Sequence, residues 1–239
     1  MGIGAAGADG DDAGIRRLAG SVRDRWGWDA AITTDVVTAH LGAFGGGPGT
    51  VLVAGTGAVA GHVDLDGTWT RSDGWGPWLG DEGSGRWLGQ AALVAAVRSA
   101  DGRGPRTVLE AAARTLAPAL VNLPQAVGSG ADVARSLAAF APVALARAAE
   151  GDPVAGRIVE RAVRRLARTA KAVTPAGGAV SVVGGLSQHP SFLASLVARL
   201  EALGLAPRRP GGSAVDGALL LAQRRDLPHE RNVLRDTLS

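Results

Sequence analysis

The chain has 239 residues, 46% of them hydrophobic and 20% charged, with a formal net charge of +3 and no cysteine. This length can form one large domain or two lobes, the small net charge argues against a nucleic-acid partner, and the missing cysteines exclude disulfides and cysteine-ligated iron–sulfur clusters. No apolar run is long enough to span a membrane and the first residues do not resemble a signal peptide, so we expect a cytoplasmic protein.

The first part of the chain predicts alternating strands and helices, because glycine-rich turns separate its apolar runs. The expected elements are a short strand ending near residue 3, a helix opened by Asp11 and Asp12, a strand end at 31–34, a helix over 36–44, and strands over 51–54 and 59–63. The apolar face of the first helix would consist of Ile15, Leu18, Val22 and Trp26. A Gly-Thr-Gly turn joins the last two strands, and an Asp-Gly pair at 66–67 predicts a hairpin.

The part of the chain after Asp81 is mainly helical. The expected helices cover about 82–98, 107–116, 132–149, 153–173, 191–203 and 213–223. A buried strand over 179–183 ends in Gly184-Gly185, a short strand follows near Leu205, and a polar tail begins at Asp226. Strands that alternate with helices indicate an α/β fold, in which ligands bind at the carboxyl ends of the strands.

Asp35 follows a predicted strand and opens a predicted helix. Asp is a good helix N-cap, so its carboxylate could serve the helix alone. It could equally point into a cleft and accept the proton of a substrate hydroxyl, because phosphoryl transfer depends mainly on positioning and charge neutralisation. The sequence leaves both interpretations open.

Three further segments have both a structural and a functional interpretation. The turn Gly55-Thr56-Gly57 is either a plain hairpin turn or a nest of backbone N–H groups for a phosphate. Asp81 lies either at the start of a helix, where acids are favourable, or against sugar hydroxyls, from which a carboxylate can accept two hydrogen bonds. Gly184-Gly185 is either an ordinary strand-to-helix turn or a place where adenosine approaches the backbone.

In this order the segments resemble the N-acetylglucosamine kinase and BadF/BadG/BcrA/BcrD-type ATPase family, which belongs to the sugar kinase, Hsp70 and actin superfamily. The resemblance rests on residues 4–7, 33–35, 53–57, 74–76, 80–84, 182–185 and 213–218. It implies an α/β fold of two RNase H-like, actin-like ATPase lobes around a nucleotide cleft. Residues 1–44 would belong to the N-terminal lobe and 45–225 would form the C-terminal lobe, while 226–239 would be a tail that packs on the N-terminal lobe.

The resemblance also implies a kinase that uses ATP and Mg²⁺ to phosphorylate a hexose or an amino sugar such as N-acetylglucosamine or glucosamine. Asp35 would be the catalytic base, and no residue is assigned to the metal itself. The nucleotide-binding residues would be Gly55, Thr56, Gly57, Gly184, Gly185 and Gly217. The substrate-binding residues would be Ala6, Gly74, Asp81 and Gly85.

The sequence departs from the family pattern at its beginning. The family's first phosphate loop, an Asp followed by glycines and a threonine, would precede residue 4 and is not found here. We therefore expect an incomplete N-terminal lobe and, because apolar surface would be exposed, a homodimer or a complementing chain. A non-catalytic sugar-binding or regulatory protein is the alternative, whereas an activator of a radical dehydratase is disfavoured because such activators hold an iron–sulfur cluster with cysteines.

Overall fold

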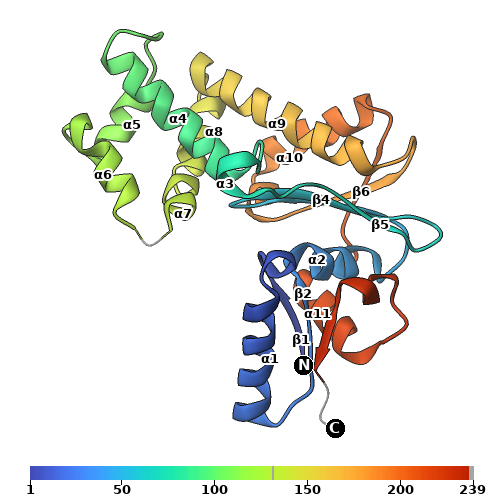
Figure 1. Ribbon diagram of the computed structural model, residues 1–239. Helices are drawn as coiled ribbons and strands as arrows, with labels where there is room; N and C mark the ends of the chain where they lie inside the picture. Colours follow the sequence, from blue (N-terminus) through green and yellow to red (C-terminus); the bar gives the residue numbers. More distant parts are fainter. Residues whose placement is uncertain (131, 237–239) are drawn as a thin grey trace.

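The computed structural model describes residues 1–130 and 132–236, which form a mixed α/β fold with two separate β-sheets. The smaller sheet has the strand order β1-β2-β8, and the larger sheet has the order β5-β4-β3-β6-β7. Figure 1 shows most of the helices above the larger sheet, the smaller sheet below it, and helix α2 between the two. Among the described helices, none combines the length and the apolarity that a membrane crossing requires.

The smaller sheet combines strands from the beginning and the end of the chain. Its strands are β1 (Gly2–Ala5), β2 (Ala30–Thr34) and β8 (Leu234–Asp236). The helices packed around it are η1 (Ala8–Gly10), α1 (Asp12–Trp26), α2 (Asp35–Phe44) and α11 (Ala214–Gln223). β1 runs parallel to β2, and β8 runs antiparallel to β2, so a strand from the tail adds to the sheet that the first residues begin.

Helix α1 packs on the smaller sheet with less of its surface than the apolar pattern predicts. Val22 is buried against Ile32, as expected for the predicted face. Leu18 and Trp26 are exposed, so the prediction is wrong for these two positions. Trp26 stacks on Trp28 beyond the helix end, with ring centroids 6.1 Å apart, instead of packing on the sheet.

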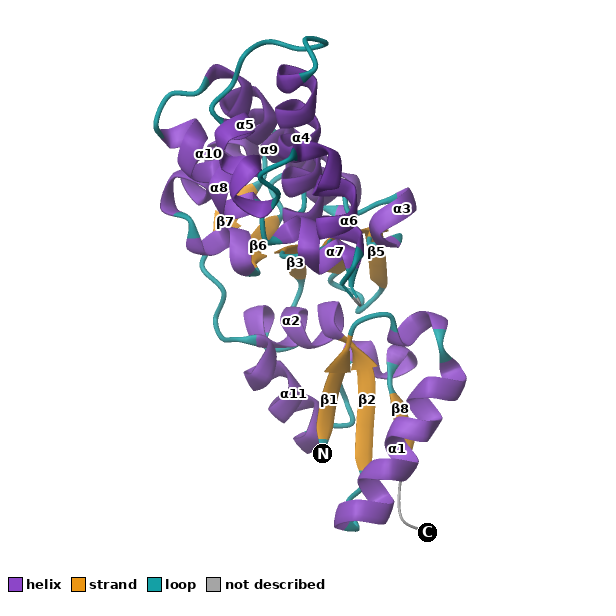
Figure 2. Ribbon diagram, turned by 90° about the vertical axis from the view of Figure 1, so that its left-hand side faces the viewer, coloured by secondary structure: helices purple, strands orange, loops and turns teal. Residues whose placement is uncertain are grey.

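Helices α2 and α11 are in backbone contact, beside β1 (Figure 2). A Cβ atom at Gly42 would overlap the Ser213 carbonyl oxygen, and one at Gly217 would overlap the Thr38 carbonyl oxygen. Glycine at both positions therefore permits this close crossing. The lobe boundaries given above remain predictions, and these contacts favour placing residues 214–223 with the smaller sheet.

The larger sheet carries the main hydrophobic core on the face covered by α4, α8 and α9. Its strands are β3 (Gly49–Ala54), β4 (Ala58–Val63), β5 (Trp69–Asp73), β6 (Ala179–Val183) and β7 (Ala206–Arg208). The helices of this part are α3 (Gly76–Leu79), α4 (Gly85–Ala100), α5 (Leu109–Leu116), η2 (Leu120–Asn122), α6 (Leu123–Gly128), α7 (Val133–Ala138), α8 (Ala141–Ala149), α9 (Pro153–Val173), η3 (Gly185–Gln188) and α10 (Pro190–Ala202), and η4 (Pro228–Asn232) lies in the tail. β3 pairs antiparallel with β4 and parallel with β6.

Two predicted helices differ from the structure. The helix expected over 132–149 is divided into α7 and α8, because Pro142 occupies the first turn of α8 and cannot donate the hydrogen bond that a continuous helix needs. The helix expected from about residue 82 begins at Gly85, with Ser84 as its N-cap. The residues before it form a turn around Asp81, which has a positive φ of 56°.

Candidate active site

Strand ends from both sheets meet at one cavity of about 520 Å³, which we call the central cavity. β1 and β2 are parallel, with Ala5 opposite Thr34, and the segments that follow these two residues line the cavity from the smaller sheet. The turn between β3 and β4 lines it from the larger sheet. The predicted site residues that line this cavity are Ala6, Asp35, Gly55, Thr56, Gly57, Gly74 and Asp81.

The junction of β2 and α2 positions Asp35. Thr34 is the helix N-cap rather than Asp35, because the Thr34 Oγ1 atom accepts the Val37 backbone N–H at 3.4 Å. The Asp35 Oδ1 atom accepts the Val36 backbone N–H at 2.9 Å, whereas Oδ2 makes no hydrogen bond within the described residues. The helix therefore does not need Asp35 as its cap, and the exposed carboxylate can bind a ligand in the cavity.

The turn at Gly55–Gly57 offers backbone donors to the central cavity. The Gly55 N–H donates to the Gly57 carbonyl oxygen at 3.0 Å, which closes the turn. The Gly55 and Thr56 carbonyl oxygens accept the N–H groups of Gly85 and Arg86 at 2.8 and 3.1 Å, so the start of α4 anchors the turn. The N–H groups of Thr56 and Gly57 have no acceptor among the described residues. Two free N–H groups beside the exposed Thr56 hydroxyl form a nest suited to an anion.

A second cavity of about 590 Å³, which we call the flanking cavity, lies beside the same turn. Gly184 has a φ of 100°, and a Cβ atom there would lie 2.7 Å from the Ala54 carbonyl oxygen. Glycine therefore lets the turn after β6 pack on the turn after β3. Gly184 and Gly185 line this cavity together with Asp35 and Val53, and the last two also line the central cavity. Asp35 thus lies where the two cavities meet.

Asp73 organises the loop that carries Asp81. Its carboxylate accepts three backbone N–H groups, from Gly74 and Asp81 at 2.8 Å and from Glu82 at 2.9 Å. Within the described residues, positive φ outside glycine occurs only at Asp73 and Asp81, at 62° and 56°. Such backbone strain persists only where surrounding contacts hold it, and it is concentrated at functional sites. Sequence analysis missed Asp73, and the Asp-Gly pair at 73–74 was the signal that could have indicated it.

Asp81 faces the Gly55–Gly57 turn from this loop. Its Oδ1 atom accepts the Ala58 backbone N–H at 3.1 Å. Burial raises the pKa of Asp81, and the negative charges of Asp73 and Asp35 raise it further, while the Ala58 N–H and the Arg86 guanidinium act in the opposite direction. Asp35 and Asp81 come from the two different sheets and line the same cavity, close enough for the Asp35 charge to raise the pKa of Asp81.

Two predicted site residues lie outside both cavities. Gly85 is buried at the start of α4, where its N–H binds the Gly55 carbonyl oxygen, and Gly217 is buried between α11 and α2. These glycines shape the backbone near the site without lining it. The polar residues of the central cavity that sequence analysis did not identify are Arg71, Asp132 and Arg135. They come from β5 and from the start of α7, and no local motif distinguishes them.

A comparison with known protein families identifies the family to which this chain is similar. Residues 4–222 match the BadF/BadG/BcrA/BcrD ATPase family. The chain belongs to this family. The match confirms the resemblance drawn from the sequence, and it spans the glycine-rich turns together with Asp35 and Asp81 of the central cavity. A search of curated proteins gave no match.

Solved structures similar to this BadF/BadG/BcrA/BcrD ATPase family member include two proposed N-acetylglucosamine kinases. The protein from Chromobacterium violaceum is 29% identical with a TM-score of 0.72, and the alignment covers 88% of this chain and 73% of that one. The protein from Porphyromonas gingivalis is 21% identical with a TM-score of 0.59, and the alignment covers 84% of this chain and 66% of that one. The likeness confirms the mixed α/β fold. An activator of the 2-hydroxyisocaproyl-CoA dehydratase from Clostridium difficile with bound ADPNP is only 12% identical, with a TM-score of 0.41.

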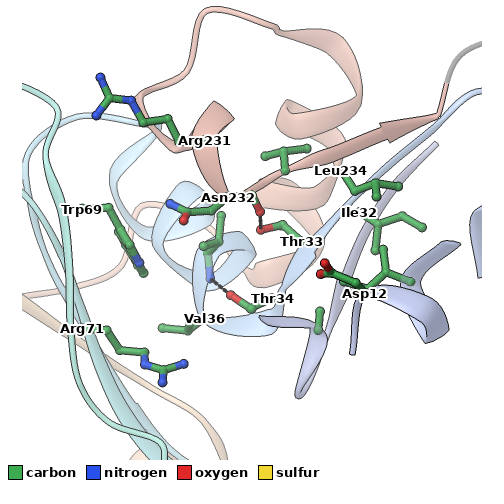
Figure 3. A pocket seen from close by; sticks show the side chains of 14 residues that line it. Asp12, Ile32, Thr33, Thr34, Val36, Trp69, Arg71, Arg231, Asn232 and Leu234 are labelled. Atoms are coloured by element: carbon green, nitrogen blue, oxygen red, sulfur yellow. Dashed lines mark hydrogen bonds between the residues drawn. The ribbon is translucent and has the colours of Figure 1, made fainter. Parts of the chain in front are cut away.

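In this family member a third cavity, of about 400 Å³, adjoins the central cavity and shares Thr34, Val36 and Arg71 with it. Figure 3 shows Arg71 and Arg231 on one side of this cavity. The Thr33 hydroxyl, at the end of β2, donates to the Asn232 carbonyl oxygen at 2.6 Å. This hydrogen bond holds the tail beside the end of β2, the strand that leads to Asp35.

Proposed function

We propose that this protein transfers the γ-phosphoryl group of ATP to a hydroxyl group of a hexose or an amino sugar. The observation that carries the proposal is the position of Asp35, which lines the central and the flanking cavity at once. A base in this reaction must reach the acceptor hydroxyl beside the terminal phosphate. Membership of the ATPase family and the likeness to proposed N-acetylglucosamine kinases support the same reaction.

The nucleotide would occupy the flanking cavity and extend toward the central one. Gly184 and Gly185 offer a surface without side chains, on which the adenosine can approach the backbone. The free N–H groups of Thr56 and Gly57 would hold the terminal phosphate, because the donors point from a turn that α4 already anchors.

The sugar would occupy the central cavity, with its hydroxyl groups against Asp81. Asp81 is ionised above its raised pKa and can then accept hydrogen bonds from two hydroxyls. Ala58 and Val59 form part of the wall and offer no side-chain amide to an acetamido group. Glucosamine and glucose are therefore candidate acceptors together with N-acetylglucosamine.

Asp35 would accept the proton of the acceptor hydroxyl as the hydroxyl oxygen bonds to the γ-phosphorus. The bond between that phosphorus and the oxygen bridging it to the β-phosphorus breaks, and ADP leaves with the electron pair. Most of the rate enhancement would come from holding the hydroxyl and the phosphate in line, since this chemistry depends on positioning and charge stabilisation.

Mg²⁺ would be bound mainly through the phosphates of the nucleotide. No group of three or more His, Cys, Asp or Glu side chains in the described part of the chain could hold a metal on its own. This fits an ion that is usually bound by one or two carboxylates and the substrate phosphates. No residue of this chain is assigned to the ion, which when bound would neutralise charge on the phosphates.

The test is ADP release with Mg-ATP and a panel of glucosamine, N-acetylglucosamine and glucose. We expect sugar-dependent release from the wild-type protein and a loss of at least about 100-fold in Asp35→Asn, the usual size of a general-base contribution. Sugar binding, measured by calorimetry, should survive in that variant. Asp24→Asn, an exposed change on α1, serves as the control. Equal turnover in Asp35→Asn and the control would refute the assignment of the base, and no release with any sugar from folded protein would refute the kinase.

A further inference from the structure

Helices α4 and α9 form a groove of about 540 Å³ that the proposed reaction does not use. Figure 1 shows both helices on the side of the larger sheet that faces away from the smaller sheet. The floor of the groove is apolar and includes Trp87, Ala91, Val94 and Ile158. Its rim carries the guanidinium groups of Arg98, Arg103, Arg157 and Arg161, and we call it the arginine groove.

The arginine groove carries positive charge that the protein itself does not neutralise. Arg103 forms an ion pair with Asp101 at 2.6 Å, and the Arg98 charge also lowers the pKa of that carboxyl, whereas Arg157 and Arg161 form no ion pair among the described residues. Arg161 lies over the Trp87 ring, 5.8 Å from its centroid. No carboxylate lines the groove, and its four arginines are exposed. Two cations without an acidic partner, Arg157 and Arg161, beside an apolar floor favour an acidic ligand that also has apolar surface.

The groove is elongated, so its shape favours a helix over a compact anion as its ligand. Its lining residues on α4 run from Trp87 to Arg98, a distance of roughly 16 Å at the rise of an α-helix. Arg157 and Arg161 lie one turn apart on α9, roughly 6 Å along its axis. A phosphate ion would contact one or two of these arginines and leave the apolar floor uncovered, whereas an acidic helix would meet both features.

We propose that the arginine groove is a docking site for an acidic amphipathic helix of a partner protein. The apolar face of that helix packs on the floor and covers Val94, which is 49% exposed in this chain. Acidic residues spaced four apart lie one turn from each other and face Arg157 and Arg161. The partner would contact α4, the helix whose first N–H groups anchor the turn at Gly55.

Fluorescence anisotropy with a labelled synthetic helix tests the proposal. The probe has leucine and alanine on one face and glutamates four residues apart on the other, and a scrambled peptide of the same composition is the comparison. We expect the wild-type protein to bind the scrambled peptide at least roughly tenfold more weakly than the probe. The Arg157→Glu/Arg161→Glu protein should bind the probe at least roughly tenfold more weakly than the wild type does. Arg16→Glu/Arg225→Glu makes the same charge change at exposed positions outside the groove and should leave binding within about twofold. A lysine counterpart of the probe should bind the Arg157→Glu/Arg161→Glu protein and not the wild type.

Three results would overturn the proposal. Equal binding of the scrambled peptide, or equal weakening by the control charge reversal, would show attraction by net charge alone. A dimer in light scattering that Arg157→Glu/Arg161→Glu converts to a monomer would assign the groove to a second copy of this chain. Single-stranded RNA that displaces the probe and binds more tightly would assign it to nucleic acid. Val94→Asp changes the floor without altering the arginines, so it tests the apolar contact if the double variant does not fold, and unchanged binding there would also refute the proposal.

Discussion

The buried histidines His40 and His229 should make the stability of this protein sensitive to acid. The His40 Nε2 atom lies 2.9 Å from the Gly49 carbonyl oxygen, and His40 Nδ1 lies 3.1 Å from His229 Nε2. A carbonyl oxygen only accepts, so His40 Nε2 carries a proton. Burial lowers the pKa of both rings, which are therefore neutral near pH 7, so His40 Nδ1 accepts and His229 Nε2 donates. His229 Nδ1 is buried without a partner among the described residues.

Burial sets the size of the effect. It lowers the pKa of His40 from 6.5 to about 4 and that of His229 to about 3, and the charge on His40 adds to the effect on His229. Because both pKa values are lower in the folded than in the unfolded protein, stability is complete above about pH 6.5 and falls as the pH drops toward the folded values. For His40 alone the shift corresponds to about 3 kcal/mol. Each such histidine adds a slope of about 1.4 kcal/mol per pH unit.

His229→Gln should therefore flatten the loss of stability between about pH 6 and about pH 4.5. The glutamine amide can donate to His40 Nδ1 but does not titrate, so the slope should fall by about 1.4 kcal/mol per pH unit. Urea unfolding at a series of pH values, monitored by tryptophan fluorescence, measures the slope. Trp69 is a local reporter, because its ring centroid lies 5.2 Å from that of His229. His189→Gln, outside this cluster, is the control. Identical acid slopes in His229→Gln, the control and the wild type would refute the argument.

Two further substitutions test the packing and the site. Gly217→Val should lower the free energy of unfolding by about 1–3 kcal/mol, because the new side chain overlaps the Thr38 carbonyl oxygen. Thermal unfolding measures the loss, and a melting temperature equal to that of the Ala218→Val control would contradict the prediction. Asp73→Ala should raise the KM for the sugar at least roughly tenfold with little change in the KM for ATP, because the loop that presents Asp81 loses three hydrogen bonds. Steady-state kinetics separate the two constants, and equal increases in both would contradict a role confined to the sugar side.

Local sequence patterns were sufficient to predict the elements that carry much of the site. Asp35, the Gly55–Gly57 turn and Gly184 each follow an apolar strand, and the apolar runs of β2, β3 and β6 were visible in the sequence. The parallel pairing of β3 with β6 brings two of these strand ends together. Because an α/β sheet gathers the carboxyl ends of its parallel strands at one edge, the expectation that the Gly55–Gly57 turn and Gly184 share one region followed from fold class alone. Asp35 follows a strand of the other sheet, so its place beside them depends on how the two sheets are arranged.

Features that depend on distant contacts could not be predicted in this way. Gly217 was assigned to the nucleotide because residues 213–218 resemble part of the family's adenosine site, whereas the structure gives it a packing role against Thr38. The Asp-Gly pair at 73–74 indicates a turn, but the role of Asp73 depends on the folded path of the loop that returns to it. The contact of His40 with His229 joins α2 to the tail, and neither residue has a local pattern that points to the other.

If the flanking cavity binds the nucleotide as proposed, its position relative to the chain crossings would link nucleotide binding to the arrangement of the two sheets. The chain passes between the sheets after α2 and again before α11, and Pro210, Gly212 and Ser213 of the second crossing line the flanking cavity. A ligand there contacts Asp35 on α2 and Gly184 after β6, so its affinity depends on how the sheets are placed relative to each other. His40 holds the same helix α2 to Gly49 on β3. We therefore expect any change in the angle between the sheets to pivot near this hydrogen bond and to move Asp35 relative to the phosphate-binding turn.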